Sequence, residues 1–350
     1  PIKFITVTRP VKFNNSTRAN TYTHFYFFVK ISHQEEVSSL TSGFPFLASS
    51  IMGPREIHVE DIDVLCSASC KIKDPARVER MLRELVAGGT GRLQIVTDFD
   101  YTITKQRMDN GQKVLSSFGI FDQCKSLPQH FRKESQLLYE KYRPIEVDPT
   151  VPMPEKVEAM IEWWRLSNEL LKGFKFDAME IDDVAARFKD SLRDGTHELF
   201  GELNRLQVPV LVFSAGLGDS VVSILRHAAV LLPNVKVVSN FLQYQDDGIL
   251  NGFQEKFIHA FNKNETALEG TEYYDLVHSR DHVIVMGDSL GDAGMADGIP
   301  KSSHVLKIGF LFDHVEQSLP KYMDTFDIVL IDDQTMRVPQ KIVSLITQPL

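Results

Sequence analysis

LQIVTDFDYT, residues 93–102, joins a short apolar run to two aspartates, Asp98 and Asp100. A short apolar run rich in β-branched residues is typical of a strand buried on both faces of a parallel sheet. In an extended segment, side chains two residues apart point to the same side. The two carboxylates could therefore act as a nucleophile and a general acid beside a divalent cation. The alternative is an ordinary acidic loop at a strand end.

Similar apolar runs recur along the chain and are separated by helical patterns. They lie at 208–213, 235–239, 282–286, 305–308 and 328–331. This alternation predicts an α/β fold with a parallel sheet and crossover helices. Ligands bind beyond the carboxyl ends of the strands in such sheets. Polar residues follow three of the strands, and they are Asp98 with Asp100, Ser214 and Asp288.

The stretch between the first two of these strands carries only helical patterns. They lie at 131–142, 154–171 and 182–206. Because an insertion of this length is too long for a loop, we expect a helical subdomain that covers the carboxyl edge of the sheet. The predicted organisation is an N-terminal extension at 1–58, an α/β core at 59–104 and 207–350, and a helical cap at 105–206.

The N-terminal extension has an aromatic run, FYFFV at 25–29, but no helix caps and no sustained periodicity. We expect it to be poorly ordered. It also lacks the basic lead, the long apolar stretch and the cleavage site of a secretory signal.

Composition excludes several classes of protein. The chain has 350 residues, of which 43% are hydrophobic, and a net charge of −9, so no general basic face is available to nucleic acid or to anionic lipid. No apolar run reaches the ~18–20 residues that a membrane helix needs. The three cysteines are too few for a disulfide framework or a zinc site. We therefore expect a cytoplasmic monomer that acts on small molecules.

A second acidic strand end, VMGDSLGD at 285–292, repeats the order of strand, glycine and aspartate. Asp288 and Asp292 offer oxygen ligands of the kind that suits Mg²⁺. An Asp-rich turn is the alternative, but the presence of two acidic strand ends in one chain favours a cation site.

Two further segments could bind phosphate. FSAGLG at 213–218 offers a hydroxyl and backbone N–H groups at a strand-to-helix turn. Lys263, in FNKN at 261–264, could neutralise a phosphoryl group. Each signal is weak by itself, since a lone lysine is usually a solvated charge.

In this order the four segments resemble the haloacid-dehalogenase (HAD) phosphohydrolase superfamily, and more closely the cytosolic 5′-nucleotidase III family with its 7-methylguanosine-phosphate-specific branch. The motifs that carry the resemblance are DFDYT at 98–102, IEVDP at 145–149, EK at 155–156, EWW at 162–164, FSAG at 213–216, NVKVVSN at 234–240, FNK at 261–263, MGDS at 286–289 and MADG at 295–298. The resemblance runs from about residue 60 to the C-terminus.

The resemblance implies a HAD-like Rossmannoid core of parallel sheet with an inserted helical cap, and the activity of a Mg²⁺-dependent phosphoric monoester hydrolase. Asp98 matches the nucleophile that forms a phospho-aspartate. Asp100 matches the general acid, which also lends its backbone carbonyl to Mg²⁺, and Asp288 matches the remaining carboxylate ligand, so the implied metal ligands are Asp98, Asp100 and Asp288. The residues that match phosphate-binding positions are Ser214, Ala215 and Lys263.

Selection of the base is expected in the cap. Glu146 and Ser167 match positions that contact the base, and Trp164 matches an aromatic residue that stacks on it. Phe118 stands where relatives often carry a histidine. Two aromatic faces could clamp a methylated, cationic purine through cation–π attraction, and Glu146 could offset its charge. The alternative is that Phe118 and Trp164 are cap core, as aromatic residues at helical spacing usually are.

The expected substrates are therefore nucleoside 5′-monophosphates, with 7-methyl-GMP favoured and CMP second. One rival is a pyrimidine-preferring 5′-nucleotidase or nucleoside phosphotransferase. A rival of another class is a catalytically silent nucleotide-binding module, which the presence of Asp98, Asp100, Lys263 and Asp288 disfavours.

Overall fold

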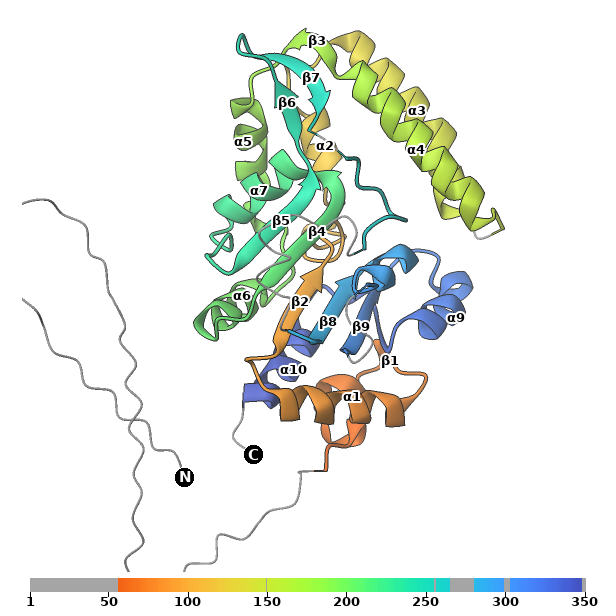
Figure 1. The fold of residues 1–350 in the computed structure, drawn as a ribbon, viewed down its shortest axis with the longest axis vertical. Helices are drawn as coiled ribbons and strands as arrows, with labels where there is room; N and C mark the ends of the chain where they lie inside the picture. The colour runs from red at the N-terminus through yellow and green to blue at the C-terminus, as the bar shows by residue number, and fades with distance from the viewer. Residues whose placement is uncertain (1–55, 149, 255, 265–279, 299–302, 348–350) are drawn as a thin grey trace, which may run out of the picture. The chain divides into compact units, whose positions relative to one another are not determined.

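A computed structural model describes residues 56–148, 150–254, 256–264, 280–298 and 303–347 (Figure 1). The prediction of a poorly ordered extension at 1–58 lies almost wholly outside these residues. No helix within the described ranges is long and apolar enough to cross a membrane.

A seven-stranded sheet forms the centre of the described chain, in the order β1-β10-β9-β8-β2-β4-β5. The strands are β1 (Cys70–Lys71), β2 (Leu93–Thr97), β4 (Val210–Leu217), β5 (Val235–Asn240), β8 (His282–Gly287), β9 (His304–Leu311) and β10 (Ile328–Ile331). Only the β1–β10 pairing is antiparallel among the described strands of this sheet. The predicted parallel sheet is therefore confirmed.

The register of the sheet brings three strand ends together. Thr97, the last residue of β2, pairs with Val212 of β4 on one side and with Met286 of β8 on the other. Because the three strands run parallel, the residues that follow these positions emerge at one edge. The polar residues predicted at strand ends therefore share that edge.

Both faces of β2 are covered, which is why its residues form an almost continuous apolar run. Leu93 and Ile95 belong to the largest hydrophobic cluster, to which α1 (Pro75–Gly88), α6 (Thr196–Arg205), α7 (Gly218–His227) and α10 (Arg337–Thr347) contribute. Val96 belongs to a second cluster, with Ile258 and Met295. A third cluster lies under α9 (Val315–Thr325).

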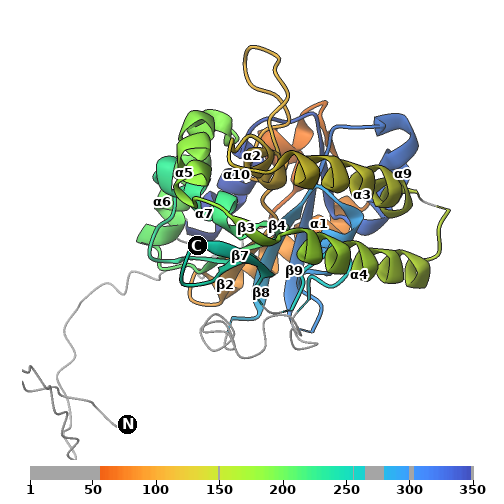
Figure 2. The ribbon, with the colours of Figure 1, turned by 90° about the horizontal axis from the view of Figure 1, so that it is seen from above.

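Three helices follow β2 within the range 105–206 that is predicted to be the cap. They are α2 (Ser117–Asp122), α3 (Gln129–Val147) and α4 (Met153–Leu170). Figures 1 and 2 show α3 and α4 side by side, on the side of the sheet toward which β2 and β8 point, and the two helices pack on each other. The helices predicted at 131–142 and 154–171 are confirmed.

The prediction that only helices lie between the strands at 93–97 and 208–213 is wrong. Strand β3 (Lys172–Lys175) lies there and pairs with β7 (Ile249–Phe253), which also pairs with β6 (Leu242–Tyr244). The predicted helix at 182–206 is also divided, into α5 (Met179–Ala185), a 3₁₀ helix at Ala186–Ser191 and α6. α5 packs against α7. The division into core and cap stays a prediction.

Candidate active site

A buried ion cluster lies at the carboxyl edge of the sheet. The Nζ atom of Lys263 is 2.5 Å from Oδ1 of Asp98 and 2.6 Å from Oδ1 of Asp292. All three residues are at most 5% exposed. The N–H of Asp98 donates to the carbonyl of Met286 at 2.9 Å, which ties the aspartate to β8. Lys263 is therefore not a solvated surface charge, as a lone lysine usually is.

The acidic groups of this edge fit a divalent cation. Asp98, Asp288 and Asp292 each offer a carboxylate oxygen, and these oxygens lie within 4.8 Å of one another. Oxygen donors of this kind suit Mg²⁺. A Cβ atom on Gly287 would lie 2.2 Å from the Cβ of Asp292, so the glycine allows Asp292 to approach the end of β8. The side-chain cluster does not test the ligand role of Asp100, which the resemblance places on its backbone carbonyl.

The charges of this cluster do not balance without a further cation. Burial raises the pKa of Asp98 to about 7, and although the Lys263 ammonium opposes this shift, Asp292 adds to it. Burial, together with the Asp98 and Asp292 carboxylates, raises the pKa of Asp288 well above its usual value. For Lys263, burial alone would lower the pKa, but Asp292 and Asp98 outweigh it and raise the pKa. A bound cation would favour the ionised forms of Asp98 and Asp288.

Asp100 is not one of the three clustered carboxylates, and Ser117, the first residue of α2, holds it. The backbone N–H of Ser117 donates to Oδ1 at 2.7 Å, and its hydroxyl donates to Oδ2 at 2.6 Å. Burial raises the pKa of Asp100, although both hydrogen bonds from Ser117 oppose the shift. A raised pKa favours the protonated form, which a general acid requires.

The predicted phosphate-binding segment lies at the end of β4. The Ser214 hydroxyl shapes this segment, because it accepts a hydrogen bond from the N–H of Gly216 at 2.9 Å. Asn240 fixes this segment from β5, because its Nδ2 donates to the carbonyl of Ala215 at 2.9 Å and to that of Ile258 at 2.8 Å. The predicted strand-to-helix turn is correct in position, although β4 itself extends to residue 217 and is followed directly by α7.

Two of the predicted base-contacting residues lie on α3 and α4. Glu146 is near the end of α3, and its carboxylate forms an ion pair with the Arg143 guanidinium. Its backbone carbonyl accepts a hydrogen bond from the buried Lys156 ammonium at 2.8 Å. Ser167 lies on α4 and is partly buried. A base that reached the Glu146 carboxylate would compete with Arg143 for it.

The predicted aromatic pair does come together. The ring centroids of Phe118 and Trp164 are 5.6 Å apart with the planes tilted by 53°, and Trp164 also packs edge-on against Phe253 at 5.4 Å. A base between two rings needs parallel planes about 7 Å apart, twice the ~3.5 Å contact distance of carbon atoms. The two rings would have to separate to admit a base, so both the clamp and the alternative of packed interior stay predictions.

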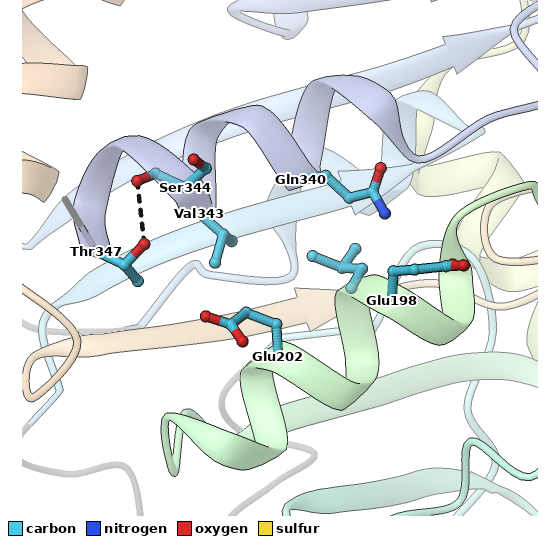
Figure 3. A pocket seen from close by; sticks show the side chains of 7 residues that line it. Glu198, Glu202, Gln340, Val343, Ser344 and Thr347 are labelled. Carbon is cyan, nitrogen blue, oxygen red and sulfur yellow. Dashed lines mark hydrogen bonds between the residues drawn. The ribbon is translucent and has the colours of Figure 1, made fainter.

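A separate cavity of about 250 Å³ lies between α6 and α10 (Figure 3). Its lining residues are Glu198, Leu199, Glu202, Gln340, Val343, Ser344 and Thr347. None of the predicted site residues lines it.

Comparison with known proteins decides the family. The pyrimidine 5′-nucleotidase (UMPH-1) family matches residues 101–347. The chain belongs to this family. Its relatives include the 7-methylguanosine phosphate-specific 5′-nucleotidase of Drosophila melanogaster, which is 63% identical over 291 residues, 83% of this chain and 91% of the relative. The human 7-methylguanosine phosphate-specific 5′-nucleotidase is 39% identical over 279 residues, 80% of this chain and 93% of the relative.

A solved structure supports the same assignment. The crystal structure of cytosolic 5′-nucleotidase IIIB bound to cytidine matches with a TM-score of 0.80 at 63% identity, over 83% of this chain and 97% of that chain. The resemblance to the cytosolic 5′-nucleotidase III family and the predicted HAD-like α/β fold are confirmed. As a member of the 5′-nucleotidase family, the chain is a phosphoric monoester hydrolase.

The structure adds three residues to the site of this 5′-nucleotidase that sequence reasoning missed. Ser117 binds Asp100, Asn240 holds the β4 end against the segment before Lys263, and Arg143 pairs with Glu146. Asn240 lies within a motif used for the resemblance, and Ser117 is the neighbour of Phe118. The sequence gives no sign of their partners, which lie 17 residues away for Ser117 and 18 and 25 residues away for Asn240.

Proposed function

We propose that this chain hydrolyses nucleoside 5′-monophosphates in a Mg²⁺-dependent reaction, with 7-methyl-GMP as the preferred substrate and CMP as a second one. The observation that carries the proposal is the buried cluster of Asp98, Lys263 and Asp292 beside Asp288 at the carboxyl edge of the sheet. The names of the relatives support the base preference: two are specific for 7-methylguanosine phosphate, and the solved structure is bound to cytidine.

In the first step a carboxylate oxygen of Asp98 attacks phosphorus, and the bond from phosphorus to O5′ breaks. Asp100 gives its proton to O5′, so the nucleoside leaves neutral and Asp98 carries the phosphoryl group. In the second step Asp100 takes a proton from water as that water attacks phosphorus. Phosphate leaves and the Asp98 carboxylate is restored. Splitting the displacement into two steps gives each a lower barrier.

Charge neutralisation makes this attack possible. The Lys263 ammonium lies against Asp98 and offsets the repulsion between a carboxylate and a phosphate dianion. Mg²⁺ would be held by the carboxylates of Asp98 and Asp288 and the backbone carbonyl of Asp100, and when bound it screens the same repulsion. Asp292 holds Lys263 in place through its own ion pair.

Substrate binding divides between the two sides of the site. Ser214 and Ala215 offer backbone N–H groups to the phosphate oxygens at the end of β4. We assign the base to Glu146 and Ser167, with Phe118 and Trp164 separating to stack on it. A cationic 7-methylguanine gains from both aromatic faces and from the Glu146 carboxylate. This assignment places base selection in the predicted cap at 105–206 and catalysis in the core.

We further propose that the protein is a cytosolic monomer. Its partners would be small nucleotides rather than nucleic acid polymers or membranes. The acidic net charge of −9 supports this choice of partners, because a nucleic acid would be repelled.

The experiment measures phosphate release from a panel of nucleoside monophosphates, with and without Mg²⁺, for the wild type, Asp98→Asn and Asp313→Asn. We expect Asp98→Asn to lose roughly 10⁴–10⁶-fold in kcat, because an amide cannot attack phosphorus. Asp313 is 74% exposed, so its variant is a control for the charge change and should retain full activity. Activity of Asp98→Asn within tenfold of wild type would refute the phospho-aspartate. A pyrimidine-preferring enzyme would turn over CMP and UMP faster than 7-methyl-GMP, and a silent module would bind nucleotide without releasing phosphate.

A further inference from the structure

The contact between Asp100 and Ser117 uses both oxygens of the carboxyl group. The Ser117 N–H is 2.7 Å from Oδ1 and the Ser117 Oγ is 2.6 Å from Oδ2. Ser117 is fully buried, so water does not compete for these bonds. The same Oγ accepts a hydrogen bond from the N–H of Leu217 at 3.1 Å, across 100 residues of sequence.

The partners of the Ser117 hydroxyl set the direction of its proton when Asp100 is ionised. A serine hydroxyl has a single proton, and here the Leu217 N–H occupies one of the two acceptor positions of the oxygen. An ionised Asp100 has no proton to give, so the hydroxyl proton points to its Oδ2. One position on each carboxyl oxygen then faces Ser117. When Asp100 is protonated and both bonds from Ser117 persist, its own proton lies at a remaining position and points away from Ser117.

The surroundings leave this pair little freedom. A Cβ atom on Gly216 would lie 2.0 Å from the Ser117 Oγ and 2.9 Å from Oδ2 of Asp100, so the end of β4 passes directly against both groups. The neighbouring Ser116 is the N-cap of α2, because its Oγ accepts a hydrogen bond from the N–H of Gly119 at 3.2 Å. The side-chain bonds of Ser117 are therefore not part of the capping of α2.

From these contacts we infer that Ser117 is a positioning residue, which orients the proton of Asp100 toward the leaving O5′ and stabilises the carboxylate that remains. The inference rests on the proposed function of Asp100. As the bond between phosphorus and O5′ breaks, the proton moves from Asp100 to O5′ and its bonding electrons stay on Asp100. The N–H and the hydroxyl of Ser117 then both donate to a carboxylate, and hydrogen bonds to an ionised group are stronger than those to a neutral one. Ser117 thus contributes more in the transition state than in the ground state.

The experiment compares Ser117→Ala, Ser117→Thr and the control Ser116→Ala, with Asp100→Asn measured in parallel. Values of kcat and KM are measured for CMP and for 4-nitrophenyl phosphate, whose leaving group needs little help from an acid. We expect Ser117→Ala to lower kcat for CMP by about 10–100-fold, the worth of one hydrogen bond to a charged group, with KM within about twofold. The loss for the aryl phosphate should be less than about threefold, since little charge develops on its leaving oxygen.

The other variants separate positioning from folding. Ser117→Thr keeps the hydroxyl and should recover most of the kcat, while Ser116→Ala removes the helix cap and should change the melting temperature without this dependence on the leaving group. Equal losses by Ser117→Ala for the two substrates, or a change confined to KM, would overturn the inference. The Asp100→Asn variant shows which of the two proposals is wrong. If Asp100→Asn loses the same factor in kcat for CMP and for the aryl phosphate, Asp100 is not the general acid and the inference about Ser117 fails with it. If Asp100→Asn loses more for CMP than for the aryl phosphate and Ser117→Ala does not, only the inference about Ser117 fails.

Discussion

Replacing Lys263 with methionine perturbs the part of the site where most charge is buried. The side chain keeps its approximate length, but the ammonium that lies 2.5 Å from Asp98 and 2.6 Å from Asp292 is lost. Removing one partner of a buried ion pair costs about 3–5 kcal/mol, because the other charge is left uncompensated. At about 2 °C per kcal/mol for a chain of this size, the melting temperature without metal should fall by roughly 6–10 °C.

The activity of Lys263→Met should fall together with its stability. Burial raises the pKa of Asp98 to about 7 even though the Lys263 ammonium opposes this shift. Without the lysine this pKa rises further, so more of the nucleophile is protonated at neutral pH. Adding Mg²⁺ should raise the melting temperature of Lys263→Met by more than that of the wild type, since the ion supplies positive charge where the lysine is missing.

Lys156→Met provides the matched control, because Lys156 is also a buried lysine. Its ammonium donates to the backbone carbonyl of Glu146, and the structure shows it no carboxylate ion-pair partner within the described residues. Melting is followed by circular dichroism in EDTA and in Mg²⁺ for the wild type and both variants. The reasoning is refuted if Lys263→Met melts in EDTA at the wild-type temperature, or if Mg²⁺ shifts all three proteins by the same amount.

Three further outcomes are expected. Trp164→Ala should lower kcat/KM for 7-methyl-GMP by roughly 10–100-fold and kcat/KM for CMP by less. Trp163→Ala, the control on the same helix, should lower only the melting temperature. An equal loss of kcat/KM for both substrates in Trp164→Ala, together with a lower melting temperature, would assign Trp164 to the packed interior. Arg193→Met should lower the melting temperature, measured by calorimetry, because the buried guanidinium donates to three backbone carbonyls that would lose their partner; an unchanged melting temperature would contradict this. Hydrogen bonding by Arg92 holds the pKa of Asp281 below its usual value. Asp281 therefore contributes stability above pH about 4, and this stability is lost as the pH falls through the folded pKa. The difference in melting temperature between the wild type and Asp281→Asn should shrink below pH about 4, and a constant difference would contradict this.

The sequence by itself determined the sheet and the place of its acidic residues. The strand from Leu93 to Thr97 is buried throughout because both of its faces are covered, and its three apolar residues within five positions indicate this in the sequence. Parallel strands have their carboxyl ends at one edge, so Asp98 and Asp288 were expected at the same edge once the strands were recognised. The pairing of β2 with β8, which makes the two residues neighbours, came from the structure. The physical reason is that strand periodicity is a local property, readable within five or six residues.

Only the tertiary structure decided which partners these residues meet. From the sequence alone Lys263 resembles any solvated lysine, yet it is buried against Asp98, which lies 165 residues earlier in the chain. Strand β3 shows no alternation of buried and exposed residues, and its pairing with β7 could not be expected from its own residues. Ser117 has no local pattern that marks it as the partner of Asp100. These contacts join segments far apart in the chain, and a contact between distant segments depends on how the elements pack, which leaves no periodic trace in either segment.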